Sequence, residues 1–153
     1  MGAAHRLGAA AQRRLSVPYS SAVEVSYEWR GEFENAEINA LHAEGFGHRL
    51  LNDDWKRQLD RNSLGWVCAR SGKELVGFVN VPWDGATHAF IIDTLVAERA
   101  RRKGIGAKMI GLAVNEARAA GCEWLHVDFD DELRTFYLDA CGFTPTAAGV
   151  IAL

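Results

Sequence analysis

The sequence is poor in cysteine and proline and has no long apolar run. Its 153 residues include three prolines and three cysteines, and Cys68, Cys122 and Cys141 form no C-x-x-C pair. Such scattered cysteines exclude a disulfide framework and do not indicate a zinc site, so we expect a cytoplasmic protein without a metal. A membrane-spanning helix needs about 20 apolar residues in succession. None of that length occurs, so we expect no membrane partner.

Positive charge is not in excess either. The 17 Lys and Arg residues are outnumbered by 20 Asp and Glu residues, which gives a net charge of −3. Nucleic-acid-binding domains normally carry a strong basic excess, so we expect no nucleic-acid partner. A chain of 153 residues, 48% of them hydrophobic and 24% charged, is typical of one globular domain.

Residues 1–20 differ in composition from the rest of the chain. They contain Arg6, Arg13, Arg14 and several alanines, and no acidic residue precedes Glu24. Organellar transit peptides have this composition, and so do disordered basic tails. We favour the tail, which leaves residues 21–153 as the folded domain.

After residue 22 the hydrophobic pattern changes period repeatedly, which indicates alternating strands and helices. The predicted strands are 23–29, 65–70, 75–81, 89–96, 124–129 and a short edge strand at 150–153; the predicted helices are 34–46, 52–62, 105–120 and 131–141. Successive hairpins predict a mixed, mostly antiparallel sheet, and the helix at 105–120 returns the chain to a parallel neighbour. The fold class is therefore α/β with one core, in the order β-α-α-β-β-β-α-β-α-β.

The most informative segment is 95–108, which leads from a strand end through a basic glycine turn into a helix. The first N–H groups of a helix lack internal partners, and the helix dipole adds partial positive charge there, so this is a site for an anion. Gly104 and Gly106 let a phosphate approach the backbone, and the basic residues at 101–103 add positive charge. On these features alone, a tight strand-to-helix connection without a ligand is an equal alternative.

Two common phosphate motifs do not fit this segment. A P-loop ends in GK[ST], which does not occur here. The dinucleotide fingerprint requires a third glycine where this chain has Met109. The spacing of Val96, Arg101, Gly104 and Gly106 instead resembles the R/Q-x-x-G-x-G/A segment of the GCN5-related N-acetyltransferase (GNAT) family.

Two more segments carry this resemblance, which covers about residues 23–153. Residues 93–96 look like the fourth strand of the family, and Phe136-Tyr137 followed by Gly142-Phe143 lies where the family ends its last helix. The resemblance implies a single-domain GNAT-like fold with helices on both faces of the sheet. It also implies acetyl-CoA as the co-substrate and direct acetyl transfer to an amine. The residues implied to bind acetyl-CoA are Leu95, Val96, Ala97, Arg101, Arg102, Lys103, Gly104, Ile105, Gly106 and Ala107.

Catalysis of this kind needs an oxyanion donor and a base. The resemblance implies that the strand at 93–96 diverges from the strand at 124–129. A backbone N–H near Leu95 or Val96 is then free to polarise the thioester carbonyl. The amine must lose a proton to a carboxylate or a histidine. Asp93, the only charged residue of its predicted strand, is the candidate catalytic base, with anchoring of a backbone turn as the other interpretation.

Tyr137 is the candidate general acid, because a tyrosine usually protonates the departing thiolate in the family. Family members commonly place this tyrosine one residue nearer the Gly-Phe pair, where this chain has Leu138. One residue turns a side chain by about 100° on a helix. Tyr137 therefore either packs in the core beside Phe136 or keeps the usual direction through a bulge or a looser last turn.

The acceptor side is less defined by the sequence. Each candidate named below has the alternative of being an exposed surface residue without a role in binding. His42 and His48, which have no metal-like partners, are predicted to be surface residues. The candidate substrate-binding residues are Trp83, His88, His126 and Asp128.

The leading hypothesis is an acetyl-CoA-dependent N-acetyltransferase that acts on a small amine or an exposed amino group, as a monomer or homodimer. A non-catalytic acyl-CoA-binding or sensing module is the alternative from another class. An acyltransferase that uses a longer acyl-CoA is a third possibility.

Overall fold

The computed structural model describes residues 24–153, so the predicted tail at 1–20 lies outside the described residues. The strands are β1 (Val25–Trp29), β2 (Ser63–Ser71), β3 (Glu74–Pro82), β4 (His88–Phe90), β5 (Ile92–Val96) and β6 (Trp124–His126). The helices are α1 (Asn35–Phe46), α2 (Trp55–Asn62) and α3 (Ile105–Ala119), with 3₁₀ helices η1 (Glu98–Ala100) and η2 (Asp131–Leu133) and a π-helix η3 (Thr135–Ala140). Within this range, no helix has the length and apolar character that crossing a bilayer requires.

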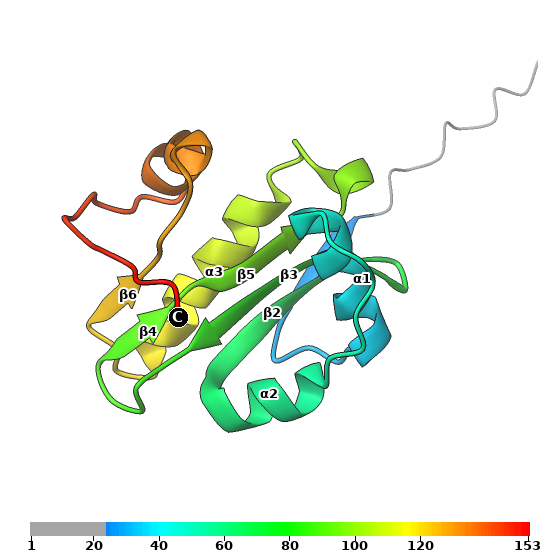
Figure 1. The fold of residues 1–153 in the computed structure, drawn as a ribbon, viewed down its shortest axis with the longest axis horizontal. Helices are drawn as coiled ribbons and strands as arrows, with labels where there is room; N and C mark the ends of the chain where they lie inside the picture. The colour runs from blue at the N-terminus through cyan, green and yellow to red at the C-terminus, as the bar shows by residue number, and fades with distance from the viewer. Residues whose placement is uncertain (1–23) are drawn as a thin grey trace, which may run out of the picture.

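The strands form two sheets (Figure 1). Four antiparallel strands lie in the order β1-β2-β3-β5, and the parallel pair β4-β6 forms the second sheet. The predicted α/β class and the mostly antiparallel sheet are confirmed. The parallel pairing follows from α3, which returns the chain to the same end of the sheet before β6 begins.

Helices cover both faces of the larger sheet, and alternate residues of β3 show which helix covers which face. A Cβ at Gly77 would lie 2.9 Å from the sulfur of Met109, so this face packs against α3. The Phe78 ring, on the opposite face, meets the ring of Trp55 at the start of α2. Figure 1 shows the same arrangement, with α1 and α2 on one side of the sheet and α3 on the other.

The loop before α2 is fixed to α1 by one buried amide. Asn39 is 3% exposed, and its side chain donates to the Asp53 carbonyl at 3.0 Å and accepts from the Asp53 N–H at 3.1 Å. The helix predicted from residue 52 begins at Trp55, and Asp54 caps it, because the Asp54 carboxylate accepts the Arg57 N–H.

The strand predicted at 89–96 is wrong as a single element, because it is interrupted at Ile91, between β4 and β5, and β5 itself contains a bulge. Leu95 lies opposite Phe78 and Ile92 opposite Asn80, so β5 holds one more residue than β3 over this stretch. Asp93 lies in the bulge with a φ of 53°, in the left-handed region that non-glycine residues seldom adopt. The bulge lets β4 turn away from the larger sheet and pair with β6.

Three predictions for the C-terminal part are also wrong. The strand predicted at 124–129 ends at His126, and the helix predicted at 131–141 is the 3₁₀ turn η2 followed by the π-helix η3. No strand forms at 150–153 in the described chain, where Val150 and Ile151 are exposed. A four-residue apolar segment without a pairing partner has no ladder of hydrogen bonds to hold it as a strand.

Packing around Gly65 predicts a clear effect on stability. A Cβ there would lie 2.2 Å from the Trp29 ring, whereas a Cβ at Gly111, in the exposed part of α3, meets nothing within 4 Å. Gly65→Ala should therefore lower the free energy of unfolding by about 1–3 kcal/mol through overpacking. Gly111→Ala should raise it by about 0.5–1 kcal/mol, because alanine favours the helix. Urea denaturation measures both, and equal effects of the two variants would contradict this description of the packing.

Candidate active site

The site begins where β5 and β6 separate. The Ile91 N–H donates to the His126 carbonyl at 2.8 Å, but among residues 24–153 β5 itself pairs only with β3 and β6 only with β4. The Ala97 N–H points to β3, where it bonds to Val76. Because successive residues of a strand present their backbone groups to opposite sides, those of Val96 face the open edge. The divergence expected between these two segments is therefore present.

The N-terminus of α3 lies beyond the end of this open edge. Gly104 caps the helix with a φ of 76°, and its carbonyl accepts the Lys108 N–H, which leaves the N–H groups of residues 105–107 without helical partners. A Cβ at Gly104 would meet nothing within 4 Å, so the backbone is open to a ligand. The side chains at 101–103 are exposed around this turn. Together these groups fit a diphosphate such as that of acetyl-CoA.

Not every predicted cofactor-binding residue presents its side chain to the opening. Leu95, Ala97 and Ile105 are buried in the core, so only their backbone groups are available. Arg101 already donates from Nε to the Val96 carbonyl at 3.1 Å. A Cβ at Gly106 would lie 3.0 Å from the Phe136 ring, so this glycine also makes room for η3.

Tyr137 lies on one side of the opening. It is buried, with its ring stacked on Phe129 at 5.0 Å between centroids and edge-on to Phe136 at 4.8 Å. Burial raises the pKa of the Tyr137 hydroxyl, and the neighbouring Thr94 side chain lowers it by a smaller amount. The Thr94 hydroxyl is buried without a well-formed hydrogen bond within residues 24–153. Tyr137 thus has a ring that packs in the core and a hydroxyl that lies beside Thr94 of β5.

The direction of Tyr137 depends on the π-helix. In η3 the Cys141 N–H bonds to the Phe136 carbonyl, five residues back. This wider turn takes up one more residue than an α-helical turn. It is the looser last turn that would offset the displacement of Tyr137 by one residue from the usual family position.

Asp93 lies on the other side of β5. Its Oδ2 accepts from the Asn80 amide at 3.4 Å, and its Oδ1 lies 3.4 Å from Nε2 of His42 on α1. His42 Nδ1 lies 2.7 Å from Nε2 of His48. His42 and His48, predicted to be surface residues, are half-buried in this cluster. The sequence offers no periodic signal for it, since His42 and Asp93 are 51 residues apart.

The comparison with known families agrees with this geometry. The model of the acetyltransferase (GNAT) family matches residues 24–143. The chain belongs to the GNAT family of acetyltransferases. The predicted family, and the GNAT-like fold with helices on both faces of its sheet, are thereby confirmed.

Solved structures share this GNAT fold at low sequence identity. A putative acetyltransferase from Deinococcus radiodurans is 22% identical, with a TM-score of 0.71 over 88% of this chain and 92% of that one. A GNAT family acetyltransferase from Streptococcus pneumoniae is 17% identical, with a TM-score of 0.69 over 85% and 98%. Glucosamine-6-phosphate N-acetyltransferase from Arabidopsis thaliana is 15% identical, with a TM-score of 0.65 over 84% and 98%. No curated protein matches the sequence.

Two of the predicted acceptor residues of this GNAT chain, His88 and His126, lie side by side on the smaller sheet. His88 Nδ1 lies 2.7 Å from His126 Nε2, and the His126 ring stacks on Phe90 at 4.8 Å. Trp83 is half-buried and forms a β-bridge to Ala89. Asp128 is exposed beyond the end of β6. The structure thus joins the two histidines, but in residues 24–153 they form no hydrogen bond with Asp93 or Tyr137. Among these residues no group of three or more His, Cys, Asp or Glu could hold a metal.

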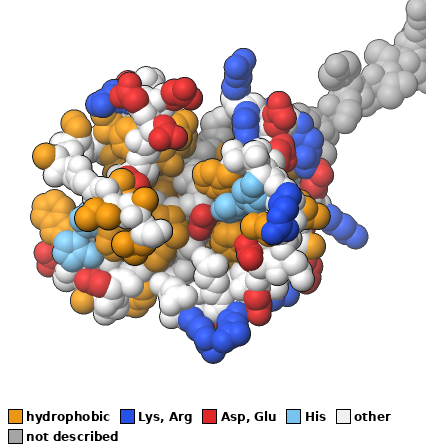
Figure 2. Space-filling model, viewed as in Figure 1, with side chains coloured by type: hydrophobic (Ala, Val, Ile, Leu, Met, Phe, Trp, Pro, Cys, Tyr) orange, Lys and Arg blue, Asp and Glu red, His pale blue; other side chains and the backbone are white. Residues whose placement is uncertain are grey.

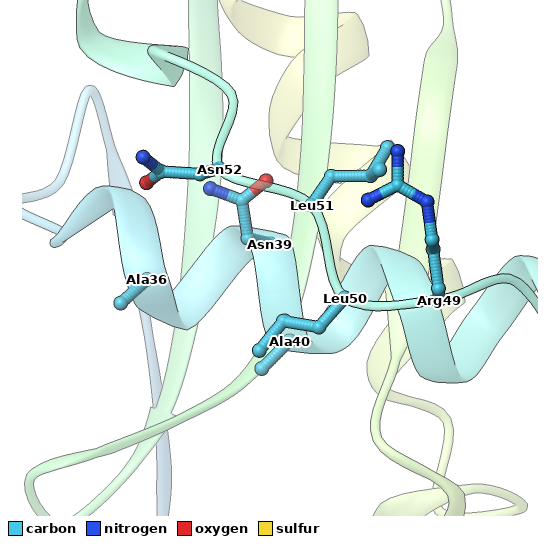
Figure 3. A pocket seen from close by; sticks show the side chains of 7 residues that line it. All are labelled: Ala36, Asn39, Ala40, Arg49, Leu50, Leu51 and Asn52. Carbon is cyan, nitrogen blue, oxygen red and sulfur yellow. The ribbon is translucent and has the colours of Figure 1, made fainter.

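The surface around the opening is hollowed. Figure 2 shows a depression between the C-terminal segments and α1, with histidine side chains next to an acidic side chain at its margin. A separate pocket of about 410 Å³ lies between α1 and the loop at 49–52 (Figure 3). Another of about 370 Å³ lies beside Phe33 and Trp66. Neither is lined by Asp93 or Tyr137, so the depression along β5 is the candidate active site of this GNAT chain.

Proposed function

We propose that this GNAT chain transfers an acetyl group from acetyl-CoA directly to a primary amine, on a small molecule or an exposed amino group. One observation carries the proposal. The open edge of β5 runs from the N-terminus of α3, where an anion can bind, to a position between the Asp93–His42 pair and the buried Tyr137 hydroxyl. Asp93 and His42 lie on one face of the strand, and Thr94 and Tyr137 on the other.

The residues that would hold acetyl-CoA follow from this arrangement. The N–H groups at the start of α3 and the side chains of Arg101, Arg102 and Lys103 bind the diphosphate. The backbone groups of Val96 bind the pantetheine arm, and its N–H polarises the acyl carbonyl. Arg101 also fixes the turn through its bond to Val96 and keeps its terminal nitrogens for phosphate. When bound, acetyl-CoA supplies the activated acetyl thioester.

Two protons must move in this reaction. The cluster at Asp93 removes a proton from the acceptor amine, and its carboxylate favours a cationic acceptor before the proton leaves. The Tyr137 hydroxyl donates to the sulfur of the leaving thiolate. Because burial raises its pKa, this phenol is protonated at neutral pH and can donate. Trp83, His88, His126 and Asp128 are the proposed contacts for the rest of the acceptor.

Acetyl-CoA should raise the melting temperature of the full chain. A ligand that binds only the native state stabilises it by about 2.7 kcal/mol at one hundred times its dissociation constant. Thermal shift is measured with acetyl-CoA, with CoA and with pantetheine, which lacks the diphosphate and should have little effect. Thiol release in a panel of amines then measures turnover. Binding without turnover of any amine would favour the acyl-CoA-binding module, and no shift with any acyl-CoA would contradict both.

A further inference from the structure

We propose that the general base is His42, held in one tautomer by His48, with Asp93 as the carboxylate that stabilises its protonated form. The inference rests on the proposed function and names a proton acceptor that the sequence did not indicate. It follows from the order of hydrogen bonds along Arg49, His48, His42 and Asp93.

The series of hydrogen bonds starts at the Arg49 carbonyl oxygen, which can only accept a hydrogen bond. Nδ1 of His48 lies 2.6 Å from the Arg49 carbonyl oxygen, so this nitrogen must carry the hydrogen and donate it. In a neutral imidazole the other nitrogen is then an acceptor. Nε2 of His48 therefore accepts, and its neighbour at 2.7 Å, Nδ1 of His42, donates.

The same rule applied to His42 leaves its Nε2 with a lone pair. This nitrogen lies 3.4 Å from Oδ1 of Asp93, so two acceptors face each other without a hydrogen between them. Such a pair favours the arrival of a proton or of an N–H group. An ammonium or amine that approaches the gap finds a hydrogen-bond acceptor on each side, and Nε2 is the atom that takes its proton.

Two aromatic rings and one neutral amide lie around the His42–Asp93 pair. The His42 ring lies 4.5 Å from that of Phe46 on α1 and 5.4 Å from that of Trp55 on α2. From β3 the neutral amide of Asn80 donates to Asp93. Among the hydrogen bonds and ion pairs of residues 24–153, those of His42 are with His48 and Asp93. His48 is an acceptor for Nδ1, and Asp93 places a carboxylate near Nε2.

The backbone conformation at Asp93 fixes the direction of its side chain toward His42. Asp93 has a positive φ, a backbone conformation that non-glycine residues seldom adopt. The bulge directs its carboxylate to α1, while the next residue, Thr94, is directed to Tyr137. The side chains of His42 and Asp93 are 24% and 18% exposed, so an amine can reach the pair from the surface depression.

The proposed proton transfer balances. An N–H bond of the amine breaks and the Nε2–H bond of His42 forms, while the new C–N bond replaces the C–S bond of the thioester. The proton of the Tyr137 hydroxyl goes to the sulfur. His42 then releases its proton to solvent, and Tyr137 regains one from solvent.

The first experiment determines the tautomers of His42 and His48 and needs no enzymatic activity. Long-range proton–nitrogen NMR spectra of the ¹⁵N-labelled full chain report which ring nitrogen of each neutral histidine carries hydrogen. We expect hydrogen on Nδ1 in both His42 and His48, assigned with the single variants His42→Asn and His48→Gln. Hydrogen on Nε2 of neutral His42 would overturn the inference. This measurement is independent of whether acetyl-CoA binds, so its failure and that of the proposed function are distinguishable.

The second experiment uses turnover of an amine found in the panel. His42→Asn keeps a donor for His48 but has no Nε2, so kcat/KM should fall about 10²–10⁴-fold with unchanged thermal shift by acetyl-CoA. His48→Gln keeps an acceptor for Nδ1 and should retain most activity, whereas His48→Leu should not. Asp93→Asn, which removes the carboxylate beside Nε2, should lower kcat/KM with an unchanged thermal shift by acetyl-CoA. An unchanged rate in His42→Asn would overturn the assignment.

Discussion

Gly104→Asp should lower the affinity for acetyl-CoA about thirtyfold while the fold remains intact. The glycine caps α3 with a positive φ, and its missing side chain faces open space at the predicted diphosphate site. A carboxylate there would repel the phosphates and weaken the positive potential of the helix N-terminus. One charge pair at 4 Å and an effective dielectric constant of 20 is worth about 4 kcal/mol. Solvent screening leaves roughly half of this, and 1.4 kcal/mol is a factor of ten.

The matched control is Gly104→Asn. Asparagine has nearly the shape of aspartate and adopts positive φ with similar ease, so backbone strain affects both variants alike. Isothermal titration with acetyl-CoA should show a small loss for asparagine and a large one for aspartate, and the difference should shrink at high salt. If aspartate binds as tightly as asparagine, the diphosphate does not lie at this helix terminus.

The cofactor segment could be predicted because its signal is local. A strand end, a basic turn with two glycines and a helix N-terminus follow one another within 95–108, and chain connectivity alone brings them together. The side chains that reach the surface there, at 101–103, are exposed as expected. What the sequence could not give is the second purpose of Gly106, since its contact with Phe136 depends on how η3 packs.

The catalytic side could be predicted only in part, because it depends on one inserted residue. The mostly apolar run at 89–96, with Asp93 as its only charged residue, fits a continuous strand, and nothing in it marks where the bulge falls. The bulge decides that Asp93 faces α1, where it meets His42, and that β4 joins β6. A contact between residues 51 positions apart has no periodic signature, so His42 was predicted to lie on the surface.

Tyr137→Phe should lower kcat about 10²–10³-fold, with acetyl-CoA affinity and stability nearly unchanged. The substitution keeps the ring, so the contacts with Phe129 and Phe136 remain. It removes a hydroxyl that makes no well-formed hydrogen bond with the neighbouring Thr94 in the described chain, so little stability is lost. General acid catalysis typically contributes a factor of this size. Steady-state kinetics, acetyl-CoA titration and thermal denaturation measure the three quantities.

The role of Tyr137 as an acid also predicts how turnover depends on pH. An acid must be protonated to act, and burial raises the pKa of Tyr137 above its ordinary value of 10.0. On the alkaline side, turnover should therefore persist above neutral pH and fall only as Tyr137 loses its proton, and Tyr137→Phe should lose that alkaline limb. Tyr27→Phe, on β1 with its ring near Lys108, is the matched control and should leave kcat unchanged. Equal turnover of Tyr137→Phe and the wild type would assign Tyr137 to core packing, and the π-turn of η3 would then serve the fit of the aromatic cluster alone.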